Sequence, residues 1–389
     1  MKKLFVLLLS FSSSVFLIRA NDVVVGAARI DQYLPLLKNK SIGLVVNQTS
    51  TVGNAHLLDT LISLGIHVQS VFAPEHGFRG TADAGEHVKN GIDPKTNVAI
   101  ISLYGDNKKP KPEQLNNIDI LLFDIQDVGV RFYTYISTLQ YVMEACAEQH
   151  KELIVLDRPN PNGHYVDGPV LDTAERSFVG MQPIPVVYGM TMGEYAGMLN
   201  GEKWLENKAH CNLTVIPCLH YDHKTFYSLP IKPSPNLPNM TSIYLYPSLC
   251  FFEGSNSVSV GRGTDKPFQL YGSPQFATSL FSFTPVSKPG ATKPFLQDQV
   301  CFGFDLSGMH PDTLRKQKFT LKYLLKAYNL STDKKIFFNT FFEKLTGKKI
   351  LRTQIEKGMD EKAIRKTWQP QLSAFKKIRK KYLLYKDFE

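Results

Sequence analysis

The chain has 389 residues and a mass of 43.9 kDa, which is enough for two domains and too much for one ordinary hydrophobic core. Hydrophobic residues make up 43% and charged residues 21%, so a disordered or fibrous protein is excluded. The net charge is +10, but residues 311–389 hold 21 of the 45 Lys and Arg and only 8 of the 35 Asp and Glu. The positive charge is therefore concentrated in the C-terminal fifth, which is either a surface for DNA, anionic lipid or an anionic polymer such as peptidoglycan, or a solvated helix face rich in Lys.

Residues 1–20 are typical of a secretory signal peptide. Two lysines precede a long apolar run, and Ala20 suits the last position before cleavage. We therefore expect a periplasmic or secreted protein with no stable membrane insertion once the signal is removed; an uncleaved N-terminal anchor is the alternative. Five cysteines are too few for a disulfide framework, and the sequence leaves open whether Cys211 and Cys218 pair.

Between residues 21 and 164, apolar runs typical of buried parallel strands alternate with helical patterns. Strands are predicted over residues 41–46, 68–72, 98–103, 118–125 and 153–156, and helices over 55–64 and 134–150. This alternation predicts an α/β fold with a Rossmann-like, doubly wound parallel sheet and right-handed crossovers.

Residues 165–389 have a different pattern, in which Pro and Gly are frequent. Short strand-like pieces at 258–260, 299–304 and 318–321 alternate with helical ones, and Asp360 is suited to cap a helix. We expect a second, smaller α+β domain that completes a cleft with the first.

Polar side chains cluster where the predicted strands end. In an open parallel sheet, ligands bind beyond the carboxyl ends of the strands. Four such clusters contain Asn47, Glu75, His76, Asp124, Asp127, Arg131 and Arg158. Since these ends share one edge of the sheet, the clusters together predict an active site there.

Of these clusters, Glu75 and His76 give the most specific indication of catalysis. Pro74 restrains the backbone before Glu75, and the following glycines allow close approach to a ligand. A carboxylate beside a histidine in such a loop suits general acid–base catalysis. The alternative is a turn in which Glu75 caps a helix and His76 is only buried. A His-Glu-x-x-His pattern is absent, so no metal is expected.

Residues 124–135 and a glycine-rich segment of the second domain supply further candidates. Arg131 suits bidentate recognition of a carboxylate, and Tyr133 or Tyr135 suits stacking against a sugar; an Asp–Arg pair that only holds the loop is the alternative. The second segment contains Glu253, Asn256 and Arg262. It is not a phosphate loop, and no dinucleotide fingerprint follows the first strand, so no cofactor is expected.

Taken together, these motifs resemble the bacterial exo-β-N-acetylmuramidase family of the NamZ type, formerly a domain of unknown function. The resemblance covers residues 42–385 and rests on ordered motifs. They are residues 47–50 (NQTS), 74–80 (PEHGFRG), 102–105 (SLYG), 124–135 (DIQDVGVRFYTY), 157–163 (DRPNPNG), 188–194 (YGMTMGE), 252–256 (FEGSN), 261–264 (GRGT) and 351–356 (LRTQIE).

The resemblance implies a glycoside hydrolase that releases N-acetylmuramic acid from the non-reducing ends of peptidoglycan fragments. It also implies a Rossmann-like domain joined to a smaller domain with the cleft between them, and it places the catalytic glutamate at Glu75. We predict His76 and Asp127 as further catalytic residues. The predicted substrate-binding residues are Asn47, Arg131, Tyr133, Arg158, Glu194, Glu253, Asn256 and Arg262.

Two alternatives to hydrolysis stay open. One is lytic elimination at the same bond, and the other is a non-catalytic cell-wall-binding protein that uses the basic tail. The expected partner is a peptidoglycan fragment ending in MurNAc–GlcNAc, and no nucleic acid. Arg131 and Arg262 are the expected partners of the lactyl carboxylate that distinguishes muramic acid from glucosamine, since a buried carboxylate without a cation is costly. The alternative is that each arginine only pairs with a nearby aspartate.

Overall fold

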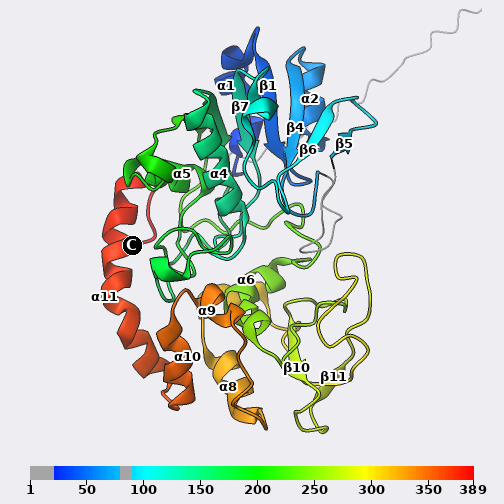
Figure 1. Cartoon of the computed structure of the whole chain (residues 1–389), viewed down its shortest axis with the longest axis vertical. Coiled ribbons are helices and arrows are strands. Elements are labelled where there is room, and N and C mark those ends of the chain that lie inside the picture. The colour runs from blue at the N-terminus through cyan, green and yellow to red at the C-terminus, as the bar shows by residue number, and fades with distance from the viewer. Residues whose placement is uncertain (1–21, 79–89) are drawn as a thin grey trace, which may run out of the picture.

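The computed structural model describes residues 22–78 and 90–389, and the predicted signal peptide lies outside this part. A seven-stranded sheet with its helices occupies one half of the molecule, and a mainly helical region with a small antiparallel sheet occupies the other (Figure 1). The predicted fold class is therefore confirmed. Within the described residues, no helix is long and apolar enough to cross a membrane.

The large sheet has the strand order β5-β6-β4-β1-β7-β8-β9, and only the edge strand β5 is antiparallel to its neighbour. Its strands are β1 (Ser41–Val46), β4 (His67–Ala73), β5 (Gly91–Ile92), β6 (Ala99–Ser102), β7 (Ile120–Asp124), β8 (Glu152–Leu156) and β9 (Asn212–Ile216). A two-stranded ribbon, β2 (Thr51–Val52) and β3 (Ala55–His56), follows β1. All the strands predicted in this half are present.

Helices cover both faces of the sheet, because side chains along each strand alternate between two apolar cores. Leu44 and Val46 of β1 join one core, and Val45 between them joins the other. The first core is covered by α1 (Ile30–Leu37) and α2 (Leu57–Ser63), and the second by α4 (Tyr135–Glu148) and α5 (Met192–Gly201). A short helix, α3 (Pro112–Leu115), precedes β7.

The second half of the molecule shares the second of these cores. Its elements are α6 (Met240–Leu249), β10 (Leu270–Ser273), β11 (Phe281–Phe283), β12 (Cys301–Asp305), α7 (Pro311–Gln317), α8 (Lys322–Leu330), α9 (Phe341–Thr346), α10 (Lys349–Glu356) and α11 (Glu361–Arg379). Buried residues of α4, α5, α6, α8 and α11 belong to one apolar cluster. The two halves therefore pack on a continuous core, which fixes the cleft between them.

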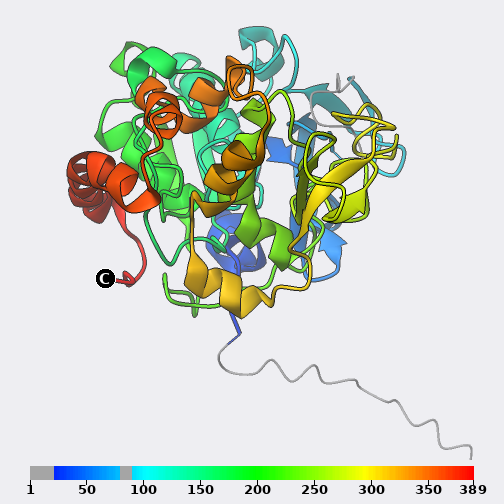
Figure 2. The same cartoon turned by 90° about the horizontal axis from the view of Figure 1, so that it is seen from below.

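The basic C-terminal helix α11 runs along the outside of both halves (Figures 1 and 2). Asp360 caps it as predicted, accepting a hydrogen bond from the backbone N–H of Ala363. Arg365 pairs with Asp167, and the buried Arg379 donates to the carbonyl of Gly189 and pairs with Asp387. Part of the positive charge of the tail is thus used to hold the C-terminal segment against the first half.

Three sequence predictions differ from this arrangement. The predicted domain boundary at residue 164 falls inside the first half, because β9 at Asn212–Ile216 completes the large sheet. Residues 258–260 and 318–321 form no strand; Ser259 makes one isolated bridge to Gly272. By contrast, the strand predicted at 299–304 is present as β12. All five cysteines, Cys211 and Cys218 included, are free thiols.

Candidate active site

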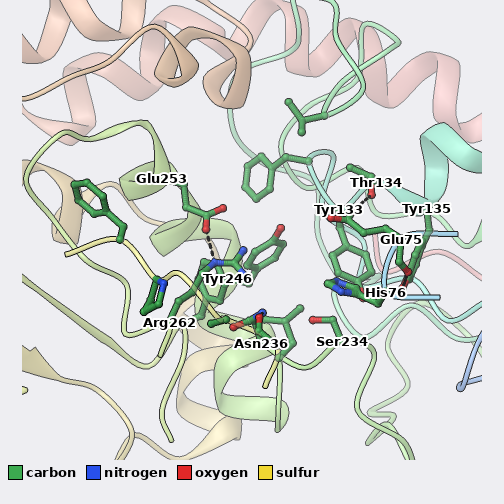
Figure 3. A pocket seen from close by; sticks show the side chains of 18 of the residues that line it. Glu75, His76, Tyr133, Thr134, Tyr135, Ser234, Asn236, Tyr246, Glu253 and Arg262 are labelled. Atoms are coloured by element: carbon green, nitrogen blue, oxygen red, sulfur yellow. Dashed lines mark hydrogen bonds and ion pairs between the residues drawn. The ribbon is translucent and has the colours of Figure 1, made fainter. Parts of the chain in front are cut away.

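A cavity of about 790 Å³ lies between the two halves, at the carboxyl edge of the large sheet. The first half contributes the loop after β4 and the start of α4, and the second contributes α6, the segment around Arg262 and residues 290–295. Of the sequence-predicted residues, Glu75, His76, Tyr133, Glu253 and Arg262 line it. Glu75 and His76 lie on one side of the cavity, and Glu253 and Arg262 lie on the other (Figure 3).

The Glu75 carboxylate is held by two hydroxyl groups. Tyr104, just after β6, donates to Oε1 at 2.9 Å, and Thr134 donates to Oε2 at 2.8 Å. Thr134 is the N-cap of α4, yet its side chain makes no capping bond to that helix and bonds Glu75 instead. The positive end of the α4 dipole faces a carboxylate at this position. These contacts orient Glu75 toward the cavity.

The backbone beside Glu75 is strained. His76 has a φ of 69°, in the left-handed region that disfavours residues with a side chain, and the turn closes with a bond from Gly77 N–H to the carbonyl of Pro74. Phe268, on the other side of the cavity, has a φ of 54°. Two of the strained residues thus line the cavity.

Arg262 and Glu253 form an ion pair on the second half's side of the cavity. Arg262 Nε donates to Glu253 Oε1 at 2.5 Å, and the guanidinium lies 4.9 Å from the centre of the Phe268 ring. Burial alone would lower the pKa of Arg262, but the Glu253 carboxylate raises it above its ordinary value, so the charge is kept. Within the described residues its two terminal nitrogens donate to no protein acceptor, and they are open to the cavity.

Aromatic rings form the floor of the cavity. Tyr246 packs edge-to-face on Phe132, Tyr133 and Phe268, and all four rings are buried. The Tyr133 hydroxyl donates to the carbonyl of Pro233 at 2.9 Å. Burial raises the pKa of Tyr133 well above its ordinary value, so it stays a neutral donor.

The structure does not place Arg131 in the cavity. Its side chain is 0% exposed, and its guanidinium donates to three backbone carbonyls: those of Pro169 and Ile184 in the first half and Leu345 in the second. Burial lowers its pKa to about 9. Arg131 therefore ties the two halves together and lies outside the cavity lining, so the structure does not support its predicted contact with a substrate carboxylate.

Five other predicted residues also lie outside the cavity lining, each with protein partners of its own. Asp127 accepts from the Tyr188 hydroxyl and from Gly129 N–H, and burial raises its pKa to about 6. Arg158 forms a bidentate pair with Asp124. The remaining three residues are bonded as follows. Asn47 accepts a hydrogen bond from the backbone N–H of Thr49, and Asn256 donates one to the carbonyl of Ile336. Glu194 caps α5 and forms a hydrogen bond with His223.

Sequence reasoning missed several residues that line the cavity. Tyr104 belongs to a quoted motif and Thr134 follows Tyr133, but neither was assigned a role, since only the fold brings them to Glu75. Lys293, Phe295 and Phe341 stand in loops or at a helix start and gave no signal. Within the described residues, no group of three or more His, Cys, Asp or Glu side chains is arranged to hold a metal ion.

Comparison with known proteins decides the family. The model of the exo-β-N-acetylmuramidase NamZ N-terminal domain matches residues 42–241, and that of the NamZ C-terminal domain matches residues 244–385. The chain belongs to the NamZ family. It is accordingly a glycoside hydrolase by family, as the motifs predicted, and the two family models divide it between residues 241 and 244.

Individual NamZ-type relatives agree with this assignment. The chain is 40% identical over 377 residues to the peptidoglycan β-N-acetylmuramidase NamZ of Bacillus subtilis, covering 92% of this chain and 89% of that one. Two crystal structures of DUF1343 family proteins from Bacteroides fragilis also match. Their identities are 49% and 28% and their TM-scores 0.88 and 0.81, and each match covers 94% of this chain and 99% of the other.

Proposed function

We propose that the protein is a secreted exo-β-N-acetylmuramidase that releases N-acetylmuramic acid from the non-reducing ends of peptidoglycan fragments, with Glu75 as general acid/base. The observation that carries the proposal is the Glu75 carboxylate, which two hydroxyl groups orient into a cavity of sugar-binding size. The name of the Bacillus subtilis relative, a peptidoglycan β-N-acetylmuramidase, supports the substrate class.

In this proposal Glu75 exchanges a proton with the atoms of the glycosidic bond. Glycosidases commonly use two carboxyl groups that flank the bond. Among the described residues, the acidic side chains of the cavity lining are Glu75 and Glu253, and they come from opposite sides of it (Figure 3). We assign the proton transfer to Glu75, whose two carboxylate oxygens accept hydrogen bonds from Tyr104 and Thr134, and the aromatic floor packs against the apolar face of the sugar.

The activity is tested with the disaccharide MurNAc–GlcNAc and mass analysis of the products. Hydrolysis adds one water across the bond and gives free MurNAc. Elimination would give a muramic acid product lighter by one water, which would keep the substrate and change the reaction. Release of neither sugar by the folded protein would contradict the proposal.

Arg262 is the cation that we assign to the lactyl carboxylate of muramic acid. Its Nε is taken by Glu253, while its two terminal nitrogens are open to the cavity and suited to a bidentate bond with a carboxylate. The side chain is also fixed by Phe268, so little ordering is needed on binding.

Arg262→Lys should therefore lower kcat/KM on MurNAc–GlcNAc by at least about tenfold, because an ammonium group cannot form two parallel hydrogen bonds. The loss should shrink on a glucosamine-terminated disaccharide, which has no lactyl group. Steady-state kinetics on both substrates measures the difference. An equal loss on the two substrates would show that Arg262 does not read the carboxylate.

We also propose that the protein acts outside the cytoplasm. The proposal rests on residues 1–20, with two lysines before an apolar run and Ala20 at a suitable cleavage position. Cell fractionation followed by N-terminal sequencing should find a chain that begins at Asn21. Full-length protein in the cytoplasmic fraction would contradict export.

A further inference from the structure

The mouth of the cavity differs in character from its floor. Phe132, Tyr246 and Phe268 at the floor are at most 6% exposed, whereas Phe295 is 48% exposed and Phe341 is 39% exposed. Both exposed rings come from the second half, one from the loop before β12 and the other from the first position of α9. Phe295 and Phe341 are thus exposed aromatic rings of the cavity lining, which a bound ligand can cover.

One loop supplies most of this rim. Residues 290–295 are six consecutive lining residues, and exposed Lys293 among them forms no ion pair with any described residue. The loop is anchored on both sides. The carbonyl of Gly290, whose φ is 86°, accepts a hydrogen bond from the Asn236 side chain. Pro294 packs closely on Gly263: a Cβ atom added to Gly263 would lie 2.6 Å from the Pro294 ring. Lys293 and Phe295 are therefore held in place beside the Arg262 segment.

This arrangement matters because an exo-acting glycosidase binds one sugar on each side of the bond that it breaks. If the muramic acid ring lies between Glu75 and Arg262, the sugar of the leaving group extends toward the exposed rim. The flat face of a pyranose ring is built of C–H groups, which gain by covering an exposed aromatic ring. A lysine ammonium group carries three N–H donors, which can bond the hydroxyl and acetyl oxygens of that sugar.

We propose that Lys293, Phe295 and Phe341 form the subsite for the leaving-group sugar, an N-acetylhexosamine ring. The inference rests on the proposed function, since it assumes that the bond is broken beside Glu75. It assigns the two sides of the bond to different groups of residues: Glu75 and Arg262 bind the acidic sugar, and the exposed rim of the second half binds its neutral partner.

The test compares Phe295→Ala, Phe341→Ala and Lys293→Met with Phe281→Ala as the matched control. Phe281 is 45% exposed on β11 and does not line the cavity. Each enzyme is assayed on MurNAc–GlcNAc and on methyl β-MurNAc, which has no second sugar. Inhibition by free GlcNAc and by free MurNAc is measured in addition.

The rim variants should raise KM for the disaccharide and the inhibition constant of GlcNAc by about fivefold. Values for the methyl glycoside and for inhibition by MurNAc should stay unchanged, as should all values of Phe281→Ala. Equal losses on the disaccharide and the methyl glycoside, or unchanged GlcNAc inhibition, would overturn the subsite while leaving the activity intact. A wild-type enzyme that cleaves neither substrate would overturn the proposed function, and the subsite with it.

Discussion

Glu75→Gln is expected to lower kcat on MurNAc–GlcNAc by about 10²–10⁴-fold, the usual loss when a general acid/base is removed. Glutamine keeps the shape of the side chain, and its amide oxygen still accepts one of the bonds from Tyr104 and Thr134. It cannot exchange a proton at neutral pH. The change therefore separates proton transfer from the packing of the loop.

The control for this variant is Glu113→Gln, on the exposed first turn of α3 and away from the cavity. Both variants should melt at the temperature of the wild type, and only Glu75→Gln should lose turnover while KM stays nearly unchanged. If Glu75→Gln is folded and turns over at close to the normal rate, Glu75 does not transfer the proton. Glu253 is then the next carboxyl group of the cavity to test.

The fold of the first half was predictable because its central strands β1, β7 and β8 are buried along almost their whole length. A strand such as β1 is a continuous apolar run, and few other structures give that pattern. β9 was missed because it is an edge strand whose residues are mostly half-exposed, so its five residues carry only a weak pattern. The predicted boundary at residue 164 leaves β9 out of the first half for the same reason, since without β9 the sheet seemed complete at residue 156.

A residue of the site was predictable only where its place at the end of a strand puts it in the site. Glu75 follows β4, and the carboxyl ends of parallel strands meet at one edge of the sheet. Arg131 lies near the same edge, but carbonyl groups as distant in sequence as Leu345 converge on its guanidinium and bury it. No local pattern reports such convergence. Lys293 and Phe295 went unnoticed because single exposed residues in a loop resemble any others.

Arg158 illustrates the difference between a polar residue at a strand end and one in a site. Its guanidinium donates to both oxygens of Asp124 and to the carbonyl of Thr51, and the pair is almost completely buried. Burial alone would lower the pKa of Arg158, but the Asp124 carboxylate raises it, so the charged pair persists. We therefore expect Arg158 to act on stability rather than on substrate.

Arg158→Met should lower the free energy of unfolding by about 3–5 kcal/mol, because it leaves the Asp124 carboxylate buried without a cation. Urea denaturation measures the change. Arg352→Met is the matched control: its ion pairs with Glu343 and Glu356 are partly exposed, and their loss should cost less than about 1 kcal/mol.

The double variant Arg158→Met with Asp124→Asn provides the decisive comparison. It removes both charges, so it should recover part of the stability that Arg158→Met loses. Such recovery means that the single variant suffers from an unpaired buried carboxylate rather than from the loss of packing. If Arg158→Met were as stable as the wild type and instead raised KM, Arg158 would contact the substrate, as its position after β8 first indicated. The cavity would then extend farther along the sheet edge than its present lining, toward Asp124 and Thr51.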